Sequence, residues 1–121
     1  MKGIVLFAHG ARDPEWALPF QRIRDGYALA HPERPVALAY LEWMQPELAQ
    51  AIGDLMGRGA TQIVVVPLFM AQGNHLKRDL PLLVEAARQA NGGVRVQVLP
   101  ALGEANDMVK AIVEWIEAVT R

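Results

Sequence analysis

The sequence of 121 residues contains no cysteine. A disulfide scaffold, thiolate metal sites, iron–sulfur clusters held by this chain and cysteine nucleophiles are therefore excluded. Serine is also absent, and the only threonines, Thr61 and Thr120, stand in unpromising settings, so hydrolysis by a hydroxyl nucleophile is a poor candidate. The groups left for chemistry are mainly three histidines and the carboxylates.

The chain also lacks an excess of positive or negative charge, because its formal net charge is −1 and it contains no basic tract. No apolar stretch approaches the roughly 18 to 20 residues of a membrane span, and the apolar run after Lys2 is too short for a signal-peptide core. We therefore expect a cytoplasmic protein that binds neither nucleic acid nor membranes. Hydrophobic residues make up 52% and charged residues 21% of the chain, which predicts one compact domain over residues 1–121.

Short apolar runs alternate with segments of helical period, a pattern typical of strand–helix units on a parallel sheet. The predicted strands are Gly3–Ala8, Val36–Leu41, Gln62–Pro67 and Val94–Leu99. The first and third are apolar runs typical of central strands, the fourth alternates as an edge strand does, and the second requires cover if it lies at an edge. Right-handed crossovers then predict a three-layer, flavodoxin-like α/β fold, with a four-stranded parallel sheet of order 2-1-3-4 and helices on both faces.

Four apolar stripes at helical spacing predict four helices that can lie on this sheet. The third helix, roughly Arg78 to Gln89, would carry Asp79 and Pro81 in its first turn, where a carboxylate and a proline are well tolerated. In chain order the four stripes are Trp16, Phe20, Ile23 and Tyr27; Leu48, Ala51, Ile52, Leu55 and Met56; Leu82, Leu83, Ala86 and Ala87; and Val109, Ile112, Val113 and Ile116.

Three polar residues follow the first three predicted strands at equal spacings of 33 residues. His9 and Glu42 follow their strands directly, and His75 lies in the loop after the third strand. Ligands of such sheets bind outside the carboxyl ends of the strands, where the strand order reverses. Each residue alone has an ordinary structural explanation, but together two imidazoles and a carboxylate suit a divalent transition metal or acid–base chemistry near neutral pH. We interpret His31, at a helix exit, as structural.

The loop that precedes His75 is longer than the usual 2 to 6 residues of such connections. It places Leu68, Phe69 and Met70 directly after the strand, with Gly73 as a hinge. One interpretation is a hydrophobic platform for a flat ligand beside the histidine. The alternative is that these side chains fold back onto the core as a plug.

Three motifs now stand in order along the chain. They are Phe7-Ala8-His9-Gly10-Ala11-Arg12, Leu41-Glu42 with Pro46 opening the next helix, and Pro67-Leu68-Phe69 continuing through Gly73, His75, Asp79 and Pro81. From Gly3 to about Pro100 the chain resembles the sirohydrochlorin chelatases of the class II chelatase superfamily, in their short single-domain form. The resemblance implies a chelatase-like fold and a lyase that inserts Co²⁺ or Fe²⁺ into sirohydrochlorin, in cobalamin or sirohaem biosynthesis. Related short forms insert nickel.

The same resemblance places the metal-handling histidines at His9 and His75 and the active-site glutamate at Glu42. The metal would be a substrate, and no permanent cofactor is expected. Neutral imidazoles would present the ion, while the glutamate would bind it or accept pyrrole protons. Ligands of these types select weakly between metals, so Ni²⁺ stays possible.

The sequence departs from the family pattern at Ala11, Met70 and Leu80, where serine, leucine and isoleucine are usual. Ala11 removes a hydroxyl that could help to hold an anion. Sirohydrochlorin carries acetate and propionate carboxylates, so a chain of net charge −1 must supply local cations. The candidates are Arg12, Lys77 and Arg78.

Three other functions share parts of this residue pattern. A histidine phosphatase usually shows Arg-His-Gly, whereas Ala8 precedes His9 here. The chain lacks the Gly-x-x-x-x-Gly-Lys-Ser/Thr motif of a nucleotide-binding or anion-binding module. Gly57 and Gly59 precede a predicted strand, whereas the glycines of such a module open a helix. A non-catalytic metal or tetrapyrrole carrier would keep the same ligands and stays open.

We also expect a homodimer with its sites between the subunits. One four-stranded domain covers only part of a macrocycle, so a second wall is needed. The apolar loop after Pro67 and an uncovered second strand offer surfaces for such an assembly.

Overall fold

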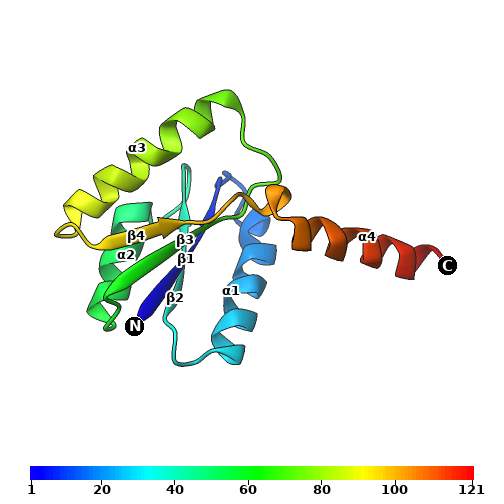
Figure 1. The fold of residues 1–121 in the computed structure, drawn as a ribbon, viewed down its shortest axis with the longest axis horizontal. Coiled ribbons are helices and arrows are strands. Elements are labelled where there is room, and N and C mark those ends of the chain that lie inside the picture. Colours follow the sequence, from blue (N-terminus) through cyan, green and yellow to red (C-terminus); the bar gives the residue numbers. More distant parts are fainter.

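The computed structural model describes residues 1–121, arranged as three layers around a parallel sheet (Figure 1). The strands lie in the order β2-β1-β3-β4, and every neighbouring pair is parallel, which confirms the predicted topology. The elements in chain order are β1 (Lys2–Ala8), the 3-10 turn η1 (Pro14–Ala17), α1 (Leu18–Ala30), β2 (Val36–Tyr40), α2 (Leu48–Gly57), β3 (Gln62–Pro67), α3 (Asn74–Ala90), β4 (Arg95–Val98), η2 (Leu102–Glu104) and α4 (Asn106–Thr120).

The two central strands, β1 and β3, are largely buried. Val5 on β1 and Val65 on β3 are fully buried and pair across the two strands. Continuous apolar runs fit these positions because side chains on both faces of these strands are largely buried. The alternating strand β4 lies at the edge and is largely exposed, as its pattern predicts.

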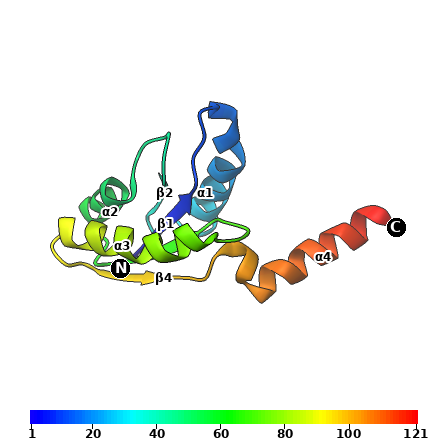
Figure 2. The same cartoon turned by 90° about the horizontal axis from the view of Figure 1, so that it is seen from above.

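Helices α2 and α3 cover one face of the sheet, and α1 covers part of the other (Figure 2). The predicted stripe of α2 is in place, with Leu48, Ala51, Ile52 and Leu55 buried. On α1, Ile23 is 45% exposed, so it does not belong to the buried side of that helix. The edge strand β2 packs between α1 and α2. Its faces are therefore covered, and the expectation of an uncovered second strand is wrong.

The third helix begins at Asn74, not near Arg78, because Gly73 takes the extended N-cap conformation. His75 accordingly lies in the first turn of α3, not in the preceding loop as predicted. Pro81 falls inside the helix and not in its first turn. Proline has no N–H, so the carbonyl oxygen of Lys77 loses its helical donor. Both residues are exposed, so water can donate a hydrogen bond to that oxygen instead.

The fourth apolar stripe does not lie on the sheet of its own chain, contrary to expectation. α4 projects from the body of the molecule, and its only substantial packing is against η2 (Figures 1 and 2). The turn η2 before the helix is held to the loop after β3, because Gly103 N donates a hydrogen bond to Phe69 O at 3.1 Å. No helix is both long and apolar enough to cross a membrane.

Candidate functional site

Two backbone hydrogen bonds continue the β1–β2 pairing beyond the end of β2. Leu41 N donates to Ala8 O at 2.9 Å, and Glu42 N donates to His9 O at 3.0 Å. The two residues that follow neighbouring strands are thereby held side by side at the carboxyl rim of the sheet. Their side chains meet, with His9 Nε2 and Glu42 Oε1 2.9 Å apart. About half of each side chain is exposed to solvent, 53% for the histidine and 51% for the glutamate.

Gly10 makes this close approach possible. Its φ is +95°, a conformation that disfavours side chains, and a Cβ there would overlap the carbonyl oxygen of Glu42. The glycine of the His-Gly pair therefore lets the two backbone segments approach closely, which places the His9 imidazole next to the Glu42 carboxylate.

His75 lines the same hollow as His9. The hollow measures about 480 Å³, and it is lined by His9, Leu41, His75, Leu76, Asp79, Leu82 and Leu83. A volume of this size is typical of small-molecule sites. The structure brings His9 and Glu42 into hydrogen-bond contact and His75 into the shared hollow, but it contains no group of three His, Cys, Asp or Glu side chains spaced to hold a metal ion.

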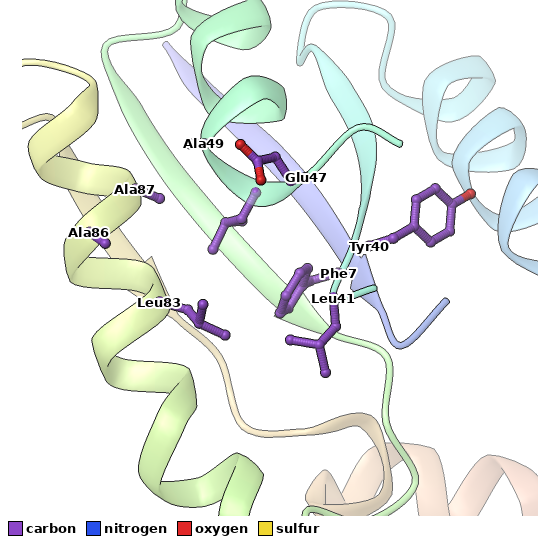
Figure 3. Close-up of a pocket in the computed structure, with 9 residues that line it drawn as sticks. Phe7, Tyr40, Leu41, Glu47, Ala49, Leu83, Ala86 and Ala87 are labelled. Carbon is purple, nitrogen blue, oxygen red and sulfur yellow. The ribbon is translucent and has the colours of Figure 1, made fainter. Parts of the chain in front are cut away.

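A second hollow, of about 230 Å³, adjoins the first between α2 and α3. The two share Leu41 and Leu83 in their walls. Figure 3 shows Leu83 on α3 facing Phe7 and Leu41 across the second hollow, whereas the Tyr40 ring points away from it. Burial raises the pKa of Tyr40. The two hollows together form an apolar trough that begins at the polar rim, an arrangement suited to a flat ligand with an apolar face and polar edges.

The predicted platform after β3 is wrong for two of its three residues. Leu68 and Phe69 are 9% and 7% exposed and belong to the core, so the plug interpretation holds for them. The Phe69 ring packs edge-on against Phe7 at 5.9 Å and against His9 at 6.5 Å, which makes it a support for the imidazole. Only Met70, 62% exposed, is available to a ligand.

The exposed apolar wall comes instead from α3, through Leu82 and Leu83. The sequence predicted these two residues in the stripe that packs on the sheet, which is wrong, because they are 67% and 39% exposed and line the hollow. Asp79, which also lines the hollow, belongs to the third sequence motif but was not predicted as a site residue. The signal was present, because His75, Asp79 and these leucines follow one another at helical spacing on one side. It becomes visible only when α3 begins at Asn74.

The three candidate cations are exposed, and none forms an ion pair with a carboxylate. The Arg12 guanidinium lies 4.1 Å from the centre of the Trp43 ring, a cation–π contact. Lys77 and Arg78 lie near the start of α3. His31 caps the end of α1 and packs on the Tyr27 ring at 4.9 Å, in agreement with a structural role.

The fold and the rim define an α/β protein of the parallel-sheet class that presents an imidazole–carboxylate pair to an apolar trough. The chain belongs to the CbiX family, whose model matches residues 3–119.

Relatives and solved structures agree with this assignment. A Saccharolobus islandicus protein named sirohydrochlorin cobaltochelatase is 40% identical over 86 residues, covering 69% of this chain and 64% of the relative. This chain thus matches less than two thirds of that relative's length. A protein of the same name from Sulfurisphaera tokodaii is 31% identical over 124 residues, covering 100% of this chain and 96% of the relative. The crystal structure of a CbiX protein from Marinobacter aquaeolei VT8 superposes with a TM-score of 0.85 at 30% identity, over 98% of this chain and 96% of that one.

Proposed function

We propose that this protein is a lyase that inserts a divalent metal ion into sirohydrochlorin, with Co²⁺ as the first candidate and Fe²⁺ as the second. The observation that carries the proposal is the half-exposed His9–Glu42 pair at the opening of an apolar hollow that His75 shares. Two relatives named sirohydrochlorin cobaltochelatase support the choice of reaction and of cobalt. The reaction would serve cobalamin or sirohaem biosynthesis.

The proposed roles follow from the balance of the reaction. A divalent ion enters the ring of four nitrogens, and two protons leave those nitrogens. In this proposal His9 and His75 deliver the ion through neutral imidazole nitrogens, and the Glu42 carboxylate binds it or accepts a departing proton. Both side chains of the hydrogen-bonded pair reach solvent, so the protons can pass on to water.

The trough and the exposed cations would hold the macrocycle. Met70, Leu82 and Leu83 offer apolar area to its flat face. Arg12, Lys77 and Arg78 would bind its carboxylates, and the arginine is already oriented by Trp43. Gly73, at the N-cap of α3, would keep the approach to the first turn of the helix open. Leu68 and Phe69 are left out of this set because they are buried.

We further propose that the working form is a homodimer, because the trough of one domain has no second wall for a macrocycle. The cytoplasmic location predicted from the sequence stays a prediction.

The decisive experiment follows the absorption change when the protein meets sirohydrochlorin with Co²⁺, Fe²⁺ or Ni²⁺, corrected for the spontaneous reaction. His9→Ala, His75→Ala and Glu42→Gln should each lower the enzymatic rate about a hundredfold or more. His31→Ala is the matched control and should keep the wild-type rate. Wild-type rates in both His9→Ala and His75→Ala would refute this site. Metal or macrocycle binding without any gain over the spontaneous rate would favour the carrier function, and a preference for Ni²⁺ would assign the nickel reaction instead.

A further inference from the structure

A third hollow, of about 320 Å³, lies beside α1 at the carboxyl ends of β1 and β2. Its walls come from α1 and from the two loops that continue from His9 and Glu42. The lining contains one arginine and no carboxylate. Five of the lining side chains can donate hydrogen bonds: Arg12, Gln21, Tyr40, Trp43 and Gln45. A hollow with several donors, a positive charge and no acid suits an anion.

Tyr40 brings an unpaired hydroxyl to this hollow. The residue is 6% exposed and packs in the core cluster under α1, and Figure 3 shows its ring turned away from the trough. Its hydroxyl forms no hydrogen bond within the chain, although a tyrosine buried to this degree ordinarily has a partner. Every fully enclosed polar side-chain atom of the protein is paired, so this oxygen borders open space, which is the third hollow. Burial raises the pKa of Tyr40, so the hydroxyl keeps its proton and can donate it.

Arg12 supplies the charge of the hollow with its donors unused. Its guanidinium lies 4.1 Å from the centre of the Trp43 ring, and stacking of this kind orients the group without engaging its N–H donors. The backbone of Trp43 has a φ of +69°, in the left-handed region that bulky residues rarely adopt. Such conformations gather at ligand sites, where the surrounding structure maintains them. The turn thus holds an aromatic ring under the arginine at the edge of the hollow.

The third hollow and the trough flank the His9–Glu42 pair from opposite faces of the sheet. Consecutive residues of a strand point to opposite faces, and accordingly Leu41 lines the trough whereas Tyr40 faces α1. Arg12 follows His9 by three residues, a span of at most about 11 Å of chain. A flat ligand whose centre lies over the pair and whose face lies on the trough therefore extends one edge toward the third hollow.

We propose that the third hollow binds one carboxylate of the macrocycle, held between the Tyr40 hydroxyl and the Arg12 guanidinium, with the Gln21 and Gln45 amides as further donors. The inference rests on the proposed function, because the carboxylate belongs to sirohydrochlorin. It makes Tyr40 a substrate-binding residue, although the tyrosine lies on the face of the sheet opposite the trough. Anchoring one edge of the ring in this hollow would fix how the macrocycle is rotated over His9 and Glu42.

Direct binding of sirohydrochlorin without metal tests the inference, with quenching of tryptophan fluorescence as the signal. Tyr40→Phe removes only the hydroxyl and should raise the Kd about tenfold or more, the effect of losing a hydrogen bond to a charged group. Tyr27→Phe is the matched control, because its hydroxyl accepts a hydrogen bond from Arg34 and lies outside the hollow, so the Kd should not change. Thermal unfolding followed by circular dichroism checks that both variants fold. An unchanged Kd in folded Tyr40→Phe overturns the inference.

Methyl-esterified sirohydrochlorin separates contact with a carboxylate from contact with the ring. The ester keeps the macrocycle but has no anionic edge groups, so the loss of affinity caused by Tyr40→Phe should be several times smaller for the ester than for the free acid. Arg12→Met, which keeps the length of the side chain without its charge, should show the same difference between the two ligands. Equal losses for acid and ester would show that Tyr40 acts on the ring or on the fold, and would overturn the inference.

A free anion has the same chemistry as the carboxylate, and inorganic phosphate distinguishes the two sources. Its binding is followed by NMR through the side-chain amide signals of Gln21 and Gln45. If Tyr40→Phe weakens phosphate binding but leaves the Kd of sirohydrochlorin unchanged, the hollow is a site for free anions and the inference is overturned. A wild-type chain that does not bind sirohydrochlorin overturns both the inference and the proposed function. Binding that depends on Tyr40 without any metal insertion supports the inference and counts against the proposed reaction alone.

Discussion

His9 Nε2 and Glu42 Oε1 lie 2.9 Å apart at the carboxyl rim of the sheet, although 33 residues of chain separate them. The contact is a product of the backbone: Glu42 N donates to His9 O, and the two strands that precede these residues are paired in parallel. An imidazole and a carboxylate held in this way can share a proton or a metal ion.

Gly10→Ala should disrupt the rim. The conformation at φ +95° alone costs a residue with a side chain about 1–3 kcal/mol, and the new Cβ would push the Glu42 carbonyl away. We expect a loss of stability in urea unfolding of at least that range, together with loss of metallation. Gly26→Ala is the control: it lies in α1 with open space around it and should gain about 0.5–1 kcal/mol. Unchanged activity in Gly10→Ala would show that the close approach is dispensable.

Phe69→Ala and Met70→Ala should separate core from surface in the loop after β3. Phe69 is 7% exposed and packs on Phe7, so its truncation should cost about 3–5 kcal/mol of unfolding free energy. Met70 is 62% exposed, and its truncation should change stability by less than about 0.5 kcal/mol. Equal losses in urea unfolding would contradict the assignment of the two side chains to different environments.

Leu82→Ser should weaken macrocycle binding without weakening the fold. The side chain is 67% exposed in the wall of the hollow, and a flat ligand would cover it. Loss of that apolar contact is worth about 1–2 kcal/mol, a rise in KM of roughly tenfold. Leu29→Ser, at an 87% exposed position on α1, is the matched control and should leave KM unchanged. A larger effect on kcat than on KM would argue that Leu82 acts in the reaction step instead.

The pKa of Glu85 should be about 2, because the side chains of Arg88 and Gln89 donate hydrogen bonds to its carboxylate. A carboxyl whose pKa falls on folding stabilises the native state above its unfolded value of about 4.3. That contribution is lost as the pH falls toward 2. A carbon-detected NMR titration gives the midpoint directly, and Arg88→Ala should return it toward the ordinary range. A midpoint near 4 in the unsubstituted protein would disprove the interaction in solution.

Much of the fold follows from local pattern. The apolar runs of β1 and β3, the alternating β4 and the strand order could all be read from the sequence, because parallel sheets leave few ways to connect alternating strands and helices. The start of α3 could not. Helical propensity around His75 and Asp79 is weak, and an internal proline indicates a first turn when only local rules are applied. The extended N-cap conformation of Gly73 sets the start of the helix at Asn74.

The site was predictable to the extent that it depends on strand ends. His9 and Glu42 follow β1 and β2 directly, so their contact is a consequence of topology. The burial of Leu68 and Phe69 and the exposure of the α4 stripe could not be predicted, because an apolar residue in a sequence does not indicate which surface will bury it. Phe69 fills the core of its own chain, whereas α4 leaves its apolar side uncovered there.

The contact between His9 and Glu42 forms only when β1 and β2 are paired, so it also indicates whether the sheet has folded. The imidazole and the carboxylate belong to different strand–helix units, so neither unit alone can bring them together. Their contact depends on a non-local, parallel pairing, a kind that forms slowly because a long loop must close first. A Co²⁺ absorption band that requires both residues would therefore appear only when the sheet has reached its native register.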